Sequence, residues 1–170
     1  MRASGAAPAR DRPKTGGVKL TIAAIGRAGR GPERDLYEHY AGRIRWPLTL
    51  RELEEKKKLP PPQLIEREGE LLLGAVPDKA VLVALDRRGK LLDSETFAKR
   101  LERWRDDSVA EVAFLIGGAD GHGETLLKRA SLVLSFGAMT WPHLLARAML
   151  AEQIYRAQQL LAGHPYHRAS

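Results

Sequence analysis

Segments typical of β-strands alternate along this chain with segments whose apolar residues recur at helical spacing. The strand-like segments are residues 18–25, 48–53, 80–86, 111–118 and 131–136. Helical spacing is found in residues 36–44, 64–72, 94–104 and 142–161. Such an alternation predicts an α/β domain, in which helices cover both faces of a largely parallel sheet.

Glycines and small residues gather where three of these strands end. Residues 117–123 contain four glycines, residues 137–143 read "GAMTWPH", and residues 85–86 close a third strand. Because ligands of open parallel sheets bind beyond the carboxyl ends of the strands, we expect one pocket there. Gly117 and Gly118 would let the backbone approach a bound ligand closely, since neither carries a side chain.

The motifs that are absent narrow the choice of ligand. The glycines fit no register of the G-x-G-x-x-G dinucleotide motif, and Lys90 lacks the following Ser or Thr of a P-loop. The chain has no G-x-S-x-G nucleophile motif either. His164 and His167 have no third ligand beside them, so we expect no metal site. The remaining interpretation is a ligand held by backbone groups, such as an adenosine without phosphates.

The net charge of +7 is spread unevenly along the chain. Residues 1–17 hold four basic residues and Asp11, which gives +3 in a Gly-, Pro- and Ala-rich extension that we predict to be disordered. Residues 18–170 are expected to form a single domain. The basic clusters of this domain suit a nucleic acid partner, although solvated surface charge explains such clusters as well.

Cysteine usage and hydropathy bear on the compartment. The chain has no cysteine, which removes disulfides and thiolate chemistry. No apolar run is long enough to span a bilayer or to serve as the core of a signal peptide. These features predict a cytoplasmic protein without a membrane partner.

Three motifs, in their order and spacing, carry a resemblance to a known family. They are "FLIGGADG" at residues 114–121, "LSFGAMTWPHLLARAMLAEQIYRA" at 134–157 and "HPYHR" at 164–168. Over roughly residues 18–168 the chain resembles the large-subunit ribosomal RNA pseudouridine-N3 methyltransferase H family of the SPOUT superfamily. The resemblance implies a SPOUT-type α/β fold with a C-terminal trefoil knot, a homodimer and S-adenosylmethionine as cofactor. It also implies an enzyme that methylates N3 of a pseudouridine in the 23S rRNA of the assembled ribosome.

The resemblance further implies which residues form the site. The implied cofactor-binding residues are Leu85, Gly118, Gly137, Ala138, Met139, Thr140, Trp141 and Pro142. The implied catalytic residues are His143, Glu152, Arg156, Tyr166, His167 and Arg168. The last three are implied to fold over the active site of the partner subunit. No metal is expected, because the cofactor itself supplies the methyl electrophile.

The chemistry leaves several roles open. N3 of the base carries a proton, so the reaction requires a proton acceptor, and a histidine or Glu152 could provide it. Glu152 and Arg156 are one helical turn apart and could simply form an ion pair. His143 could equally be structural. Asp120 and His122 are not required by the family and are expected to be loop surface.

Two other functions are compatible with the same sequence. One is a non-catalytic ribosome-binding or assembly factor on the same fold, and the other is a tRNA methyltransferase of the same superfamily. Tight binding of S-adenosylmethionine would separate an enzyme from a mere binder. Only substrate assays would separate rRNA from tRNA, because the basic charge serves both equally.

Overall fold

The computed structural model describes residues 17–163, so nearly all of the 1–17 extension and the "HPYHR" motif lie outside the described residues. The strands are β1 (Lys19–Ile25), β2 (Leu48–Leu53), β3 (Val81–Leu91), β4 (Glu111–Ile116) and β5 (Leu132–Ser135). They form one sheet in the order β2-β1-β4-β3-β5, and every neighbouring pair is parallel. The predicted α/β fold with a parallel sheet is confirmed, while the trefoil knot stays a prediction.

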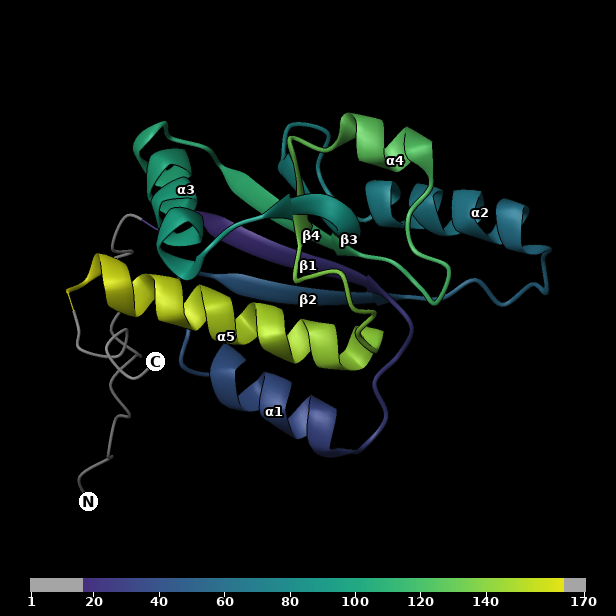
Figure 1. Ribbon diagram of the computed structural model, residues 1–170, viewed down its shortest axis with the longest axis horizontal. Coiled ribbons are helices and arrows are strands. Elements are labelled where there is room, and N and C mark those ends of the chain that lie inside the picture. The colour runs from purple at the N-terminus through teal and green to yellow at the C-terminus, as the bar shows by residue number, and fades with distance from the viewer. Residues whose placement is uncertain (1–16, 164–170) are drawn as a thin grey trace, which may run out of the picture.

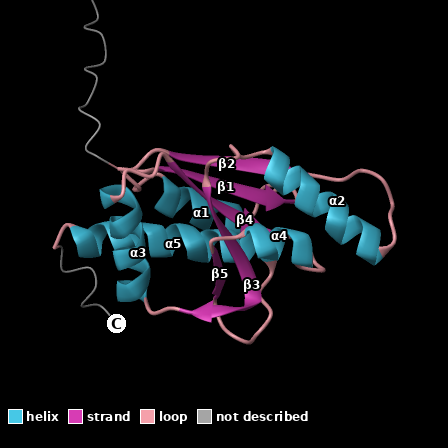
Figure 2. Ribbon diagram, turned by 90° about the horizontal axis from the view of Figure 1, so that it is seen from above, coloured by secondary structure: helices cyan, strands magenta, loops and turns pink. Residues whose placement is uncertain are grey.

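Helices cover both faces of this sheet (Figures 1 and 2). One face carries α1 (Pro32–Ala41), α3 (Ser94–Asp106) and α5 (His143–Leu161), and the other carries α2 (Pro61–Gly74) and α4 (Glu124–Arg129). Successive side chains of a strand point to opposite faces. Leu20 and Ile22 of β1 therefore pack in the first layer, whereas Ala23 and Ile25 pack in the second.

Strand β3 is longer than the sequence predicted, since it continues past residue 86 to Leu91. Leu85 and Lys90 both align with Leu134 of β5, so residues 86–89 form a bulge between them. Gly89 lies so close to the backbone of Val133 that a β-carbon would overlap with it. The sequence did not reveal this extension because its residues are mostly charged and lack the apolar run that marks the other strands.

Helix α5 starts near the carboxyl edge of the sheet with His143, one of the implied catalytic residues. It begins at His143 with Pro142 as its N-cap, so Pro142 precedes the first turn in which the sequence placed it. The helix contacts both α1 and α3. Its buried positions therefore lie on more than one side, and they are Arg147, Ala148, Leu150, Ala151, Ile154 and Ala157.

Candidate functional site

A pocket of about 830 Å³ lies beyond the carboxyl ends of β4 and β5 and beside the bulge of β3, and we call it the strand-end pocket. Its volume is in the range of small-molecule sites. Seven of the eight implied cofactor-binding residues line it: Leu85, Gly118, Gly137, Met139, Thr140, Trp141 and Pro142. Ala138 is the one that does not. The structure thus brings residues from the ends of β4 and β5 and from the bulge of β3 into one cavity.

The segment after β5 forms one wall of the strand-end pocket. Gly137 has a φ of 120°, a conformation that glycine adopts far more easily than other residues. Its N–H donates to Oγ of Ser135 over 3.0 Å, which fixes the turn. Beyond it, the side chains of Met139 and Trp141 stay open to solvent, with 75% and 41% of their surface exposed.

The glycine loop after β4 forms the opposite wall, and here one expectation was wrong. Asp120 is exposed as predicted, but His122 is buried, with only 5% of its surface exposed. Nε2 of His122 donates to the carbonyl oxygen of Leu115 over 3.0 Å. Burial lowers the pKa of His122, so its ring is neutral near pH 7. The imidazole folds inward and fixes the loop to β4, which the polar sequence of the loop did not indicate.

Asp86 and Arg88 join the β3 bulge to the glycine loop. Nε and Nη2 of Arg88 each donate to a carboxylate oxygen of Asp86 over 2.8 Å. Nη2 of Arg88 also donates to the carbonyl oxygen of His122 over 2.8 Å. These bonds lower the pKa of Asp86 to about 2. Arg88 was not among the residues that the sequence implied for the site, and its pairing with Asp86 and the His122 carbonyl shows that it is structural.

Gly118 has a different neighbour from the ligand that the sequence suggested. A β-carbon at Gly118 would meet the carboxylate of Glu68 in α2. Glu68 accepts a hydrogen bond from the Gly118 N–H and is buried, and this burial raises its pKa. The absent side chain of Gly118 therefore makes room for a buried acid. The signal for Glu68 was its place on the apolar side of α2, four residues from both Leu64 and Leu72.

His143 lines the strand-end pocket and lies beside a buried arginine on the same helix. A β-carbon at Gly26 would lie 3.3 Å from Nε2 of His143, so the imidazole contacts the end of β1. Burial and the Arg147 cation lower the pKa of His143. Arg147 is only 2% exposed and donates from Nη1 to Oε2 of Glu52 over 2.7 Å. Sequence analysis assigned no role to Arg147 or Glu52.

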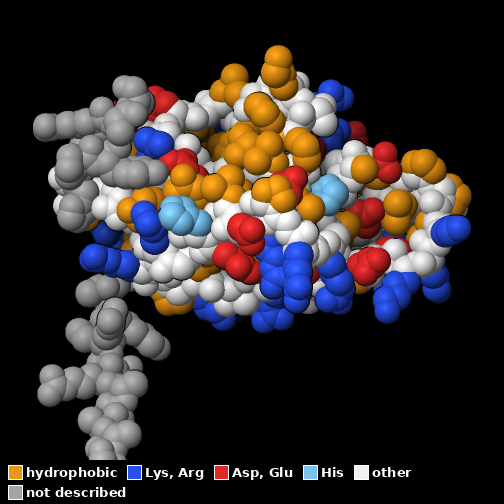
Figure 3. Space-filling view, turned by 90° about the horizontal axis from the view of Figure 1, so that it is seen from below, with side chains coloured by type: hydrophobic (Ala, Val, Ile, Leu, Met, Phe, Trp, Pro, Cys, Tyr) orange, Lys and Arg blue, Asp and Glu red, His pale blue; other side chains and the backbone are white. Residues whose placement is uncertain are grey.

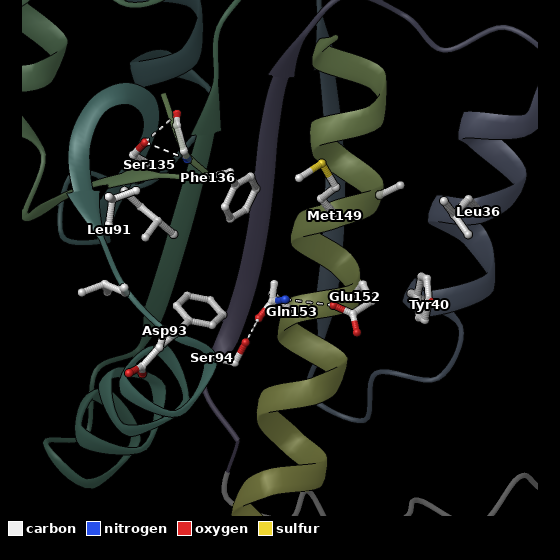
Figure 4. A pocket seen from close by; sticks show the side chains of 15 residues that line it. Leu36, Tyr40, Leu91, Asp93, Ser94, Ser135, Phe136, Met149, Glu152 and Gln153 are labelled. Atoms are coloured by element: carbon white, nitrogen blue, oxygen red, sulfur yellow. Dashed lines mark hydrogen bonds between the residues drawn. The ribbon is translucent and has the colours of Figure 1, made fainter. Parts of the chain in front are cut away.

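A second cavity of about 610 Å³ lies between α1, α3, α5 and the ends of β3 and β5 (Figure 4), and we call it the helix hollow. Glu152 lines this hollow. It accepts from Arg156 over 2.6 and 3.0 Å and from Nε2 of Gln153 over 3.1 Å. The expected ion pair between Glu152 and Arg156 is thus present.

The structure separates the implied catalytic residues. His143 and Glu152 are nine positions apart in α5, which places them on opposite sides of the helix, about 13 Å apart along its axis. One chain therefore does not bring both side chains to the same atom of a substrate. The remaining implied residues, Tyr166, His167 and Arg168, lie outside the described residues.

The described residues, 17–163, hold neither a candidate metal site nor a membrane-spanning helix. In this part of the chain, no group of three or more His, Asp or Glu side chains lies together as a metal site would require. No helix of the described residues is long and apolar enough to cross a membrane.

A strand-end pocket on a parallel sheet whose motifs follow β4 and β5 is the arrangement expected of a SPOUT methyltransferase. The family model described as "Predicted SPOUT methyltransferase" matches residues 18–167. The chain belongs to this family and is a methyltransferase of the SPOUT type.

Its relatives carry a more particular name. The chain is 60% identical over 152 residues to the ribosomal RNA large subunit methyltransferase H of Rhodospirillum centenum, covering 89% of this chain and 100% of that protein. It is 56% identical to the protein of the same name from Paramagnetospirillum magneticum, covering 89% of this chain and 99% of that protein. The predicted family is confirmed.

One solved structure supports the fold. The crystal structure of a probable methyltransferase from Bordetella pertussis Tohama I superimposes with a TM-score of 0.51 at 13% identity. The superposition covers 82% of this chain and 93% of that one. At this identity the likeness concerns the fold alone.

Proposed function

We propose that this chain transfers a methyl group from S-adenosylmethionine to N3 of a pseudouridine in 23S rRNA, with the assembled ribosome as substrate. The names of the relatives, which the chain matches over nearly their full length, support rRNA as the substrate. The strand-end pocket carries the proposal, because it gathers the residues that the family resemblance assigns to the cofactor. An enzyme that modifies ribosomes would work in the cytoplasm.

The lining of the strand-end pocket suits an adenosine-bearing cofactor without phosphates. Five glycines and two alanines are among its lining residues, and they allow a ligand to approach the backbone closely. The exposed side chains of Met139 and Trp141 offer apolar surface to a flat base. Of the three carboxylates that line the pocket, Asp86 is paired with Arg88 and Glu124 lies 3.9 Å from Lys128, which leaves Asp120 to attract a cation. The bound cofactor would supply a methyl carbon attached to a positively charged sulfur.

In this proposal His143 accepts the proton of N3. Its lowered pKa leaves the imidazole neutral near pH 7, so a ring nitrogen has a free electron pair. As the proton moves from N3 to His143, the electron pair of N3 forms the bond to the methyl carbon. The bound cofactor would give up its methyl group and keep the electrons of the carbon–sulfur bond, so charge and atoms would balance. Glu152 is less suited to this role, because it lies in the helix hollow and pairs with Arg156.

We further propose that two copies of the chain form a homodimer through the helix hollow. Figure 3 shows hydrophobic side chains gathered on the face that carries α1 and α5. Leu36 and Leu91 line the hollow and are 41% and 73% exposed. Exposed apolar surface of this kind is typical of protein contacts. In such a dimer, Tyr166, His167 and Arg168 of one chain would complete the site of the other.

Methyl transfer from labelled cofactor tests the proposed function. Purified protein is offered 70S ribosomes, 50S subunits, free 23S rRNA and tRNA, and incorporated label is counted. We expect label in ribosomes, at a position where reverse transcription stops, because a methyl group on N3 blocks base pairing. Label in tRNA alone would support the tRNA reading. Tight cofactor binding without transfer to any RNA would contradict the proposed enzyme.

A further inference from the structure

The connection between β1 and α1 is a basic, glycine-rich loop at the carboxyl edge of the sheet. Residues 26–31 read "GRAGRG", with three glycines and two arginines. Both Arg27 and Arg30 are exposed. Nε of Arg27 lies 3.6 Å from Oε2 of Glu54, and within residues 17–163 Arg30 makes no ion pair. A loop of this composition is flexible unless other residues hold it.

A buried arginine and a glutamate hold this loop from below. Nη2 of Arg147 donates to the carbonyl oxygens of Gly26 over 2.6 Å and Ile25 over 3.1 Å. Oε2 of Glu52 accepts both from Nη1 of Arg147 over 2.7 Å and from the Ala28 N–H over 2.6 Å. Burial opposes ionisation of Glu52, but these hydrogen bonds hold its pKa below the usual value. The start of the loop is therefore fixed to β2 and α5.

Folding stability alone does not explain the ion pair between Arg147 and Glu52. An ion pair taken out of water gains little over apolar side chains of similar volume, because desolvation offsets the attraction. This pair instead satisfies two backbone groups of the loop, the Gly26 carbonyl and the Ala28 N–H, and the carbonyl of Ile25 at the end of β1. The ion pair therefore holds the start of the loop, residues 26–28, in one conformation, whereas a glycine-rich loop without such contacts would adopt many.

The loop also adjoins the strand-end pocket. Gly26, its first residue, contacts the imidazole of His143, which lines that pocket. A nucleotide whose base entered the pocket would keep its backbone phosphates outside, near the rim. Arginine is the side chain best suited to phosphate, since its planar group donates two parallel hydrogen bonds.

We propose that Glu52 and Arg147 are positioning residues that hold residues 26–31 so that Arg27 and Arg30 contact backbone phosphates of the RNA substrate. The proposal rests on the proposed function, because it concerns the RNA of that same reaction. Arg27 and Arg30 bind the substrate, whereas Glu52 and Arg147 act only through the loop. None of these four residues lines the strand-end pocket.

The first experiment removes the two exposed arginines. The double variant Arg27→Ala, Arg30→Ala should raise the KM for ribosomes at least tenfold and leave kcat, cofactor affinity and Tm near wild type. We plot the logarithm of the association constant for RNA against the logarithm of the salt concentration. The steepness of this line should decrease by about 1 to 2, since each phosphate contact contributes slightly less than one unit to the slope. As a control, the double variant Arg103→Ala, Arg105→Ala removes the same charge from the end of α3. It should change neither the KM for ribosomes nor the salt dependence. A wild-type KM in the loop variant would overturn the proposal.

The second experiment tests whether the buried pair acts through the loop. Arg147→Lys and Glu52→Gln should each raise the KM for ribosomes while cofactor affinity stays unchanged, and hydrogen exchange at the Ala28 amide should become faster. Added to the Arg27→Ala, Arg30→Ala variant, Arg147→Lys should raise the KM little further, because residues that act as one unit are not additive. Fully additive effects would overturn the positioning role. If the wild-type protein methylates no RNA at all, the proposed function fails instead.

Discussion

The strand-end pocket and the helix hollow share Leu134, Phe136 and Gly137 but are built differently. The walls of the pocket are mostly loops, fixed by contacts such as those of Arg88 with Asp86 and the backbone of His122. The walls of the hollow are largely side chains of helices, and two of its lining residues, Leu36 of α1 and Leu91 of β3, are apolar and exposed. Fixed loop walls suit a small ligand of one shape, whereas exposed apolar side chains suit another protein surface. The difference teaches that neighbouring cavities of similar size need not share a role.

The largest expected effect comes from replacing His143, the residue of the strand-end pocket that we propose as the proton acceptor. His143→Gln should lower kcat for ribosome methylation about 100-fold or more, the usual scale of losing a general base. In the wild type the base must be unprotonated, so the rate should fall as pH drops through the pKa of His143. That pKa is lowered by burial and by the Arg147 cation, which puts the acidic limb below pH 6.5.

The pH profile of the variant supplies the check. A rate measured from pH 5 to 9 should show the acidic limb in the wild type and lose it in His143→Gln. Cofactor affinity, measured by calorimetry, should stay within a few-fold of wild type. An unchanged limb in the variant would assign the proton transfer to another group and would weaken the contrast between the two cavities.

The next effect concerns the turn that both cavities share. Gly137→Ala should weaken cofactor binding about 10- to 100-fold, because φ near 120° is strained for alanine and the turn must shift. Gly163→Ala is the matched control, since Gly163 also has a positive φ, 73°, with open space where a β-carbon would lie. It should cost stability at the end of α5 but no cofactor affinity. Equal calorimetric affinities of Gly137→Ala and wild type would contradict the role of the turn.

The contrast also explains how much the sequence could reveal. The pocket's position was predictable because strands show as local apolar runs and glycines follow them at 117–123 and 137. The polar contacts that hold its walls were not predictable, because each joins residues far apart in the sequence. Arg88 contacts the carbonyl of His122, and Arg147 contacts Glu52. Local patterns carry no information on such pairs. The helix hollow was not predictable either, because three helices must first pack together to form it.

A smaller effect tests the hollow as a subunit contact. Leu91→Glu should weaken the proposed homodimer at least tenfold, because a carboxylate would be buried without a partner. In a single chain the same change should cost little, since Leu91 is 73% exposed. Gln63→Glu adds the same charge on α2, on the other face of the sheet, and should leave the dimer intact. Sedimentation equilibrium measures both, and an unweakened Leu91→Glu dimer would move the contact elsewhere.

The smallest effect concerns the ion pair between Asp86 and Arg88, which holds the glycine loop of the pocket and which we call the clamp. Asp86→Asn should lower the free energy of unfolding at pH 7 by about 1 kcal/mol. The fall in pKa from 3.8 to about 2 sets an upper limit near 2.4 kcal/mol, at about 1.36 kcal/mol per unit. The smaller figure allows for solvent screening, because the side chain of Arg88 is 55% exposed.

The pH dependence of this effect has a definite sign. Asp86 has a lowered pKa in the folded state, so its contribution is present above pH 3.8 and is lost as the pH falls towards 2. Urea unfolding of wild type and Asp86→Asn should therefore give a gap at pH 7 that narrows through pH 3. A gap that stays constant over this range would mean that the clamp acts through the shape of its hydrogen bonds. The conformation of the pocket's loops would then depend on the hydrogen-bond geometry at position 86 and not on the charge of Asp86.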